Sequence, residues 1–126
     1  MNSIQSIIRT ILQQDSRISE IAGGRVYDLV FPQGYTIPSV TLQRISETLD
    51  ACNLSGTTLL QIDSYARSHG DAEDLAEAVR QTLTNTTRDG DPVILGILPQ
   101  NTVDFYTADN RLYRISADYA VAWRKK

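Results

Sequence analysis

Residues 111–123 read RLYRISADYAVAW, and this stretch decides the fold. From Tyr113 to Trp123 every second residue is apolar or aromatic, which is the period of a strand that buries one face. The positions between them include Arg114, Ser116 and Asp118. We therefore expect a strand whose apolar side packs against helix and whose polar side meets solvent or a partner.

The hairpin partner of this strand is predicted just upstream. Residues 103–106 include Val103, Phe105 and Tyr106 and precede the turn pair Asp109-Asn110, which together indicate a hairpin. Farther upstream, residues 93–98 are predicted as a separate short strand. Residues 84–92 are rich in Thr, Asn, Asp and Gly and are predicted as a surface loop.

A first amphipathic helix is predicted over residues 3–13. Its apolar side chains recur at three- and four-residue spacing and form one stripe: Ile4, Ile7, Ile8, Ile11 and Leu12. Asp15 or Ser16 is expected to cap a second short helical turn, which carries Ile18 and Ile21. That turn ends at Gly23-Gly24, residues that tolerate positive φ.

The second main helix is predicted from the acidic stretch that opens at Asp71. Its first carboxylates meet the positive end of the helix dipole, and its inner stripe repeats at four-residue spacing: Leu75, Val79 and Leu83. Before it, residues 25–31, 39–48 and 60–67 show extended patterns. The last two of these segments are expected to pair across a long loop, residues 49–57.

These elements predict an α+β fold with a single, mostly antiparallel sheet flanked by two main helices. The order along the chain is helix, strands, helix, strands. A length of 126 residues with 41% hydrophobic residues is typical of one globular domain, here residues 1–126.

Composition narrows the classes of function. The net charge is −3, whereas binding of nucleic acid through its phosphates needs clustered Lys and Arg. No apolar window reaches the length of a membrane span, so we expect no membrane association. The single Cys52 predicts a disulfide-free cytoplasmic protein.

No set of residues suggests catalysis. His69 is the only histidine and is expected to be an exposed loop residue beside a helix cap, while Cys52 is read as an incidental thiol. The four carboxylates between Asp71 and Glu77 favour a solvated helix face over a metal site. Residues 124–126 are read as a solvated basic tail. We expect no catalytic residue, no metal and no cofactor, and a protein that is not an enzyme.

The ordered elements resemble a phage family, the tail completion or tail terminator proteins that join siphophage tails to heads. The resemblance extends along nearly the whole chain. It is carried by IAGGRVY at residues 21–27, IPSVTLQR at 37–44, LQIDSYA at 60–66, DAEDLAEAVR at 71–80 and LYRISADY at 112–119.

The resemblance implies a structural virion protein that forms a ring, generally a hexamer, on the last ring of tail tube subunits. It would stop tube growth and join the tail to the head, so its partners would be itself, the tail tube protein and the head-tail connector or stopper. It would act in the tail or neck of the virion after assembly in the host cytoplasm. Six subunits would carry 6 × −3 = −18 charges, which suits a channel through which DNA slides without sequence-specific binding.

Candidate interface residues are expected on both long loops, on the outer side of the Asp71 helix and on the polar side of the last hairpin. They are Asp50, Asn53, Arg67, Glu73, Glu77, Arg88, Asp89, Arg111, Arg114 and Asp118. Two alternatives stay open: a neck stopper or adaptor that contacts the portal side, and a small bacterial ligand-binding domain, which would be monomeric with a polar pocket.

Overall fold

A computed structural model describes residues 3–28, 36–50, 52–108 and 111–126. The elements follow the order α1 (Ile4–Gln14), α2 (Ser16–Ala22), β1 (Val26–Asp28), β2 (Ser39–Leu49), β3 (Ser55–Ala66), α3 (His69–Leu83), β4 (Val93–Thr107) and β5 (Leu112–Arg124). This order confirms the predicted α+β class and the predicted succession of helix, strands, helix and strands.

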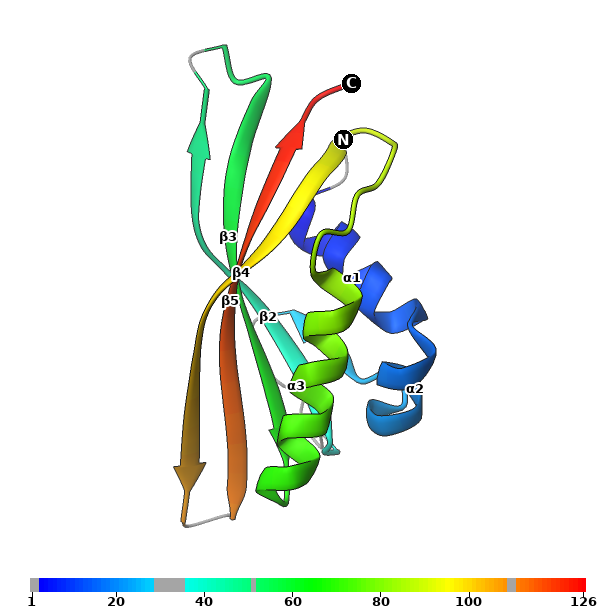
Figure 1. The fold of residues 1–126 in the computed structure, drawn as a ribbon, viewed down its shortest axis with the longest axis vertical. Helices are drawn as coiled ribbons and strands as arrows, with labels where there is room; N and C mark the ends of the chain where they lie inside the picture. The colour runs from blue at the N-terminus through cyan, green and yellow to red at the C-terminus, as the bar shows by residue number, and fades with distance from the viewer. Residues whose placement is uncertain (1–2, 29–35, 51, 109–110) are drawn as a thin grey trace.

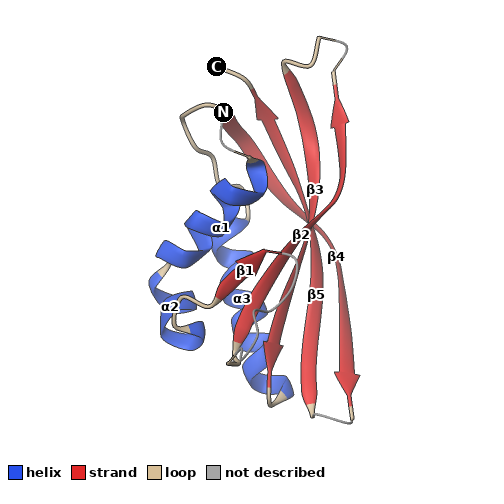
Figure 2. Ribbon diagram, turned by 180° about the vertical axis from the view of Figure 1, so that it is seen from behind, coloured by secondary structure: helices blue, strands red, loops and turns tan. Residues whose placement is uncertain are grey.

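The five strands form one sheet in the order β1-β2-β3-β5-β4. Only β1 and β2 run parallel, and the other neighbours pair antiparallel. All three helices lie on one face of this sheet, and no helix of the described residues covers the opposite face (Figure 1). Seen from behind, the strands twist strongly about the middle of the sheet. The β2–β3 hairpin extends beyond the helices at one end, and β4 and β5 end about level with the beginning of α3 at the other (Figure 2).

The helices begin where the sequence places capping side chains. Ser3 caps α1 by accepting from the N–H of Ser6, and Asp15 caps α2 by accepting from the N–H groups of Arg17 and Ile18. Gly23, with φ of 58°, ends α2 in the left-handed conformation, as glycine does at low cost.

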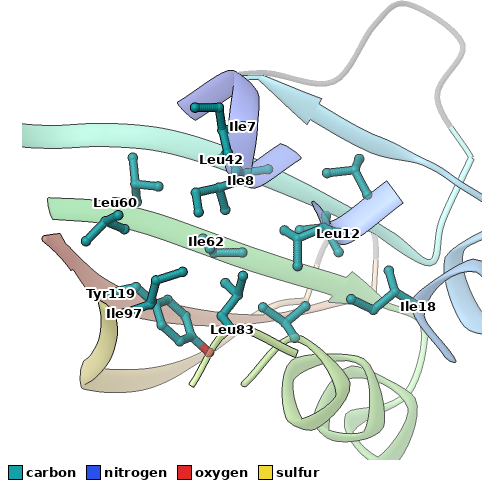
Figure 3. Close-up of a cluster of buried hydrophobic side chains, with 14 of the residues drawn as sticks. Ile7, Ile8, Leu12, Ile18, Leu42, Leu60, Ile62, Leu83, Ile97 and Tyr119 are labelled. Atoms are coloured by element: carbon teal, nitrogen blue, oxygen red, sulfur yellow. The ribbon is translucent and has the colours of Figure 1, made fainter. Parts of the chain in front are cut away.

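The core lies between the helices and the sheet (Figure 3). The predicted stripes of α1 and α3 point into it, and β3 and β5 supply the opposite wall. The largest side chains that are almost fully buried there are Ile8, Leu12, Ile18, Leu42, Leu60, Ile62, Leu75, Leu83, Ile94, Ile97 and Tyr119. Burial of each such side chain stabilises the fold by about 1.5–3 kcal/mol, so this layer holds the helices in place.

Two predicted boundaries are wrong. Residues 93–98 and 103–106 are not separate strands but parts of the continuous β4, because Ile94–Thr107 stays paired with β5 through two register shifts. The predicted loop 49–57 is a five-residue connection, residues 50–54, because Gly56 pairs with both Leu49 and Trp123. The polar residues next to this connection are extended because they pair with neighbouring strands, and not because of their own β-propensity.

Two smaller expectations change as well. His69 is not a loop residue, because Ser68 is the N-cap and α3 begins at His69. The predicted strand 25–31 is observed as Val26–Asp28; Arg25 precedes it, and residues 29–31 lie outside the described residues, as does the turn pair Asp109-Asn110.

Candidate interaction surface

We call the helix-free side of the sheet the bare face. The register places Gln61 beside Asp118, Asp63 beside Ser116, and Val103 beside Ser116 from the other strand. The face is hollowed at its centre by a depression of about 280 Å³. Its lining residues are Ile45, Gln61, Asn101, Val103, Phe105, Ser116 and Asp118.

A hydrogen-bonded polar network forms the floor of this hollow. The Gln61 amide donates to Ser116 Oγ at 2.6 Å and to Asp63 Oδ1 at 3.3 Å, and Tyr65 donates its O–H to Asp63 Oδ2 at 3.4 Å. Burial raises the pKa of Tyr65, which keeps this hydroxyl a donor. Ser116 and Asp63 are both buried, although the sequence predicts that the polar side meets solvent or a partner, and Gln61 and Tyr65 hydrogen-bond to them.

Apolar side chains stand exposed around that floor. Ile45 is 47% exposed, Val103 45% and Phe105 44%. The guanidinium of Arg114 lies 4.2 Å from the centre of the Phe105 ring, a cation–π contact that orients both side chains. An exposed apolar patch with a polar surround is typical of a protein–protein interaction site.

An acidic groove of about 420 Å³ lies on the helix side, between α3 and β4–β5. Glu73, Asp74, Glu77 and Asp104 line it with one cation, Arg80. Arg80 pairs with Glu77 one helical turn away, and this hydrogen bond lowers the pKa of Glu77. Glu73, Asp74 and Glu77 are all exposed, so the predicted solvated face of α3 is confirmed, and it also forms one wall of this groove.

His69 joins the beginning of α3 to β4. Its Nε2 lies 3.1 Å from Asp104 Oδ2 and its Nδ1 3.0 Å from Glu73 Oε1. The contact with Asp104 raises the pKa of His69, and the charge of Glu73 adds to this. The ring also stacks obliquely against Tyr113, with centroids 5.9 Å apart. His69 therefore contacts α3 and β4 at the same time, and we call these contacts the His69 clasp.

The ten predicted interface residues do not converge on one site. Asp50 and Asn53 lie in the β2–β3 connection, Arg88 and Asp89 precede β4, and Glu73 and Glu77 point outward from α3. The remaining four belong to the ends and the bare face of the β3–β5 region: Arg67, Arg111, Arg114 and Asp118. The prediction missed the apolar part of the bare face, which consists of Ile45, Val103 and Phe105. The alternation of apolar and polar residues in these segments of the sequence could have indicated it.

Among the described residues, no group of three or more His, Cys, Asp or Glu side chains is arranged to hold a metal ion. Cys52 is exposed and free. No helix in the described part of the chain has both the length and the apolar character needed to cross a bilayer.

Comparison with known families decides the assignment, since the model of the tail completion protein gp17 family matches residues 7–123. The chain belongs to this tail completion family. It is therefore a structural protein of phage tails, and the resemblance predicted from the sequence is confirmed.

Solved structures support the fold of this tail completion protein. A chain from the virion of a native gene transfer agent particle superposes with a TM-score of 0.83 at 17% identity, covering 97% of this chain and 95% of that one. A second solved chain gives a TM-score of 0.59 at 12% identity, with 99% of each chain covered. At these identities the likeness concerns the fold alone. No curated protein matches.

Proposed function

We propose that this tail completion protein forms a closed ring, a hexamer, at the head-proximal end of a tail tube. The ring ends tube growth and presents the surface to which the head binds. The observation that carries the proposal is the bare face, an exposed apolar surface around Ile45, Val103 and Phe105 on a chain of the tail completion family. An exposed apolar surface of this kind marks a protein–protein interaction site.

A ring of identical subunits requires two different contact surfaces on each subunit. The bare face and the helix side provide them, since one is apolar with a buried polar floor and the other is acidic and salt-bridged. We assign contacts with neighbours to Arg67, Arg111, Arg114 and Asp118 and to Glu73 and Glu77 on α3. Contacts with the tube or the connector are assigned to the two loops that carry Asp50, Asn53, Arg88 and Asp89.

In this function the protein acts by shape and charge, with no catalytic step and no cofactor. Six copies carry a formal charge of −18 from 6 × −3, which repels phosphates and lets DNA pass without sequence-specific binding. The partners are further copies of the chain, the tail tube protein and the connector or stopper protein. The protein assembles in the host cytoplasm and stays in the virion.

The test measures the mass of the purified protein alone and mixed with isolated tail tubes, followed by electron microscopy of the mixture. Rings that cap one end of each tube and halt its growth support the proposal. Rings that ignore tubes but bind portal complexes would identify a neck stopper instead. A persistent monomer that ignores both partners would rule out ring formation as its function.

A further inference from the structure

The outer edge of β4 is half covered and half open. Near its start, Ile94 exchanges two backbone hydrogen bonds with Arg88, and the carbonyl of Ile97 accepts from the N–H of Asn85. From Thr102 to Thr107, the described residues provide no strand or loop that pairs with this edge. This open half contains no proline and one charged residue, Asp104, so it lacks the usual features that keep edge strands from pairing.

The opposite edge of the sheet repeats this division at the other end. β1 covers β2 only from Val40 to Leu42. From Gln43 to Leu49, β2 is exposed throughout and has no partner on its outer edge among the described residues. Each subunit therefore carries two open half-edges, one on β2 and one on β4, at opposite sides and opposite ends of the sheet.

The two half-edges are complementary in direction and in side chains. β4 runs antiparallel to β2, since three antiparallel steps separate them. On the bare face, exposed Ile45 of β2 matches exposed Val103 and Phe105 of β4. On the helix side, pairing of Ser46 with Phe105 places Asp104 opposite Glu47, whose carboxylate already pairs with Arg44 on its own strand, so the apolar side chains of the bare face carry the match.

We propose that neighbouring copies join by antiparallel pairing of residues 102–107 of one chain with residues 43–49 of the next, so that the sheet continues from subunit to subunit. The proposal rests on the ring proposed above and adds a main-chain contact along the sheet edges to the side-chain contacts assigned there. Main-chain hydrogen bonds give this strand addition its affinity, and the matched side chains set its partner. The occupant is a second copy, because the chain itself carries both complementary edges.

The geometry of a closed ring agrees with this contact. Ser46 is level with Leu98, through Leu59 and Ala120, so the open half of β4 begins several residues farther along. From one copy to the next, the sheet is therefore displaced by about 18 Å along the strands and by about 19 Å across them, which corresponds to four strand spacings. A ring without rise then tilts the strands by roughly 45°, within the range of closed barrels, and six copies give a sheet wall about 50 Å across.

Disulfide trapping tests the contact in rings capping isolated tail tubes. In a Cys52→Ser background, we expect a double variant such as Ser46→Cys with Phe105→Cys to form a covalent ladder of up to six chains on a non-reducing gel, because paired strands bring Cα atoms within disulfide range. Neither single variant should do so. If the strands pair antiparallel and cysteines at Ser46 and Phe105 link, then cysteines at Thr48 and Val103 should also link. Cysteines at Gln43 and Val103 should not.

A matched charge series provides the second readout. Val103→Lys with Phe105→Lys should reduce the fraction of ring-capped tubes at least tenfold. Leu98→Lys, on the same face but on the covered half of β4, should leave that fraction unchanged. Melting of each variant monomer shows whether it is folded.

The outcomes separate this contact from the ring itself. Wild-type rings with no ladder from any pairing of residues 43–49 with residues 102–107 would overturn the edge contact and leave the ring function standing. Linkage in parallel order, or equal loss of rings in the Leu98 control, would also overturn it. Failure of the wild-type protein to form rings on tubes would instead refute the proposed function, and the contact with it.

Discussion

A buried hydrogen-bond relay holds three strands together where the β2–β3 hairpin leaves the core, and it gives a sharp prediction. The indole of Trp123 donates to Thr58 Oγ1 at 3.0 Å, and Thr58 donates its own hydrogen to Glu47 Oε1 at 2.9 Å. Thr58 and Trp123 are 1% and 3% exposed. Thr58→Val keeps the volume but leaves the indole N–H buried without its acceptor, at a cost of about 1–3 kcal/mol.

We expect Thr58→Val to lower the free energy of unfolding by about 2 kcal/mol, which corresponds to a melting temperature lower by roughly 8 °C for a chain of this length. Trp123→Phe should cost about 2–3 kcal/mol, because it removes the donor and part of a buried ring. The double variant should cost about 1 kcal/mol less than the sum of the two. Urea unfolding measured by circular dichroism suits all four proteins, since Trp123 is the only tryptophan. Costs that add within about 0.5 kcal/mol would refute the relay.

Three further predictions concern the clasp, a glycine and a cap. His69 has a raised pKa in the folded state because of Asp104 and Glu73, so its stabilisation is complete below pH 6.5 and is lost as the pH rises through the raised value; His69→Gln should remove this part of the pH dependence of melting, and an unchanged profile would contradict the clasp. Gly56→Ala should cost about 1–3 kcal/mol, because the added Cβ would lie 2.4 Å from the carbonyl of Thr48; Gly96→Ala, where the Cβ meets nothing within 4 Å, is the control, and equal melting of the two would refute the clash. Ser68→Ala should cost about 1 kcal/mol in urea unfolding, since Ser68 Oγ accepts from the N–H of Asp71; Ser68→Asp should retain stability, and a neutral alanine variant would count against the cap.

The sequence predicts best those elements that bury one side and expose the other, because their apolar residues then recur at a regular spacing. The stripes of α1 and α3 and the period of β5 follow directly from burial against one core. The sequence predicts two strands where the structure has the single β4, which stays paired with β5 through register shifts at Ile94/Gly96 and Pro99/Thr102. Pro99 is tolerated there because β4 is an edge strand, and edge position is a property of the sheet order, which local patterns do not contain.

The candidate site was harder to predict because its contacts join residues far apart in the chain. His69 and Asp104 are 35 positions apart, and Gln61 and Ser116 are 55 apart. No local spacing indicates such pairs. The acidic character of α3 and the position of Arg114 and Asp118 on the helix-free side were predictable, whereas the burial of Asp63 and Ser116 depends on neighbours that strand pairing brings beside them.

The core and the proposed assembly contacts lie in different parts of this molecule. The fully buried side chains lie under the three helices, while residues 43–49 of β2 and 98–107 of β4 are exposed. Segments with few buried contacts open at low free energy, so amide hydrogens in residues 43–49 and 102–107 should exchange fast in the free protein, and those of β3 next to Leu60 slowly. If strand pairing between copies closes the ring, the same two segments gain protection on tail tubes, whereas protection of the core stays the same. Slow exchange of both segments in the free subunit would mean that their edges are already covered before assembly.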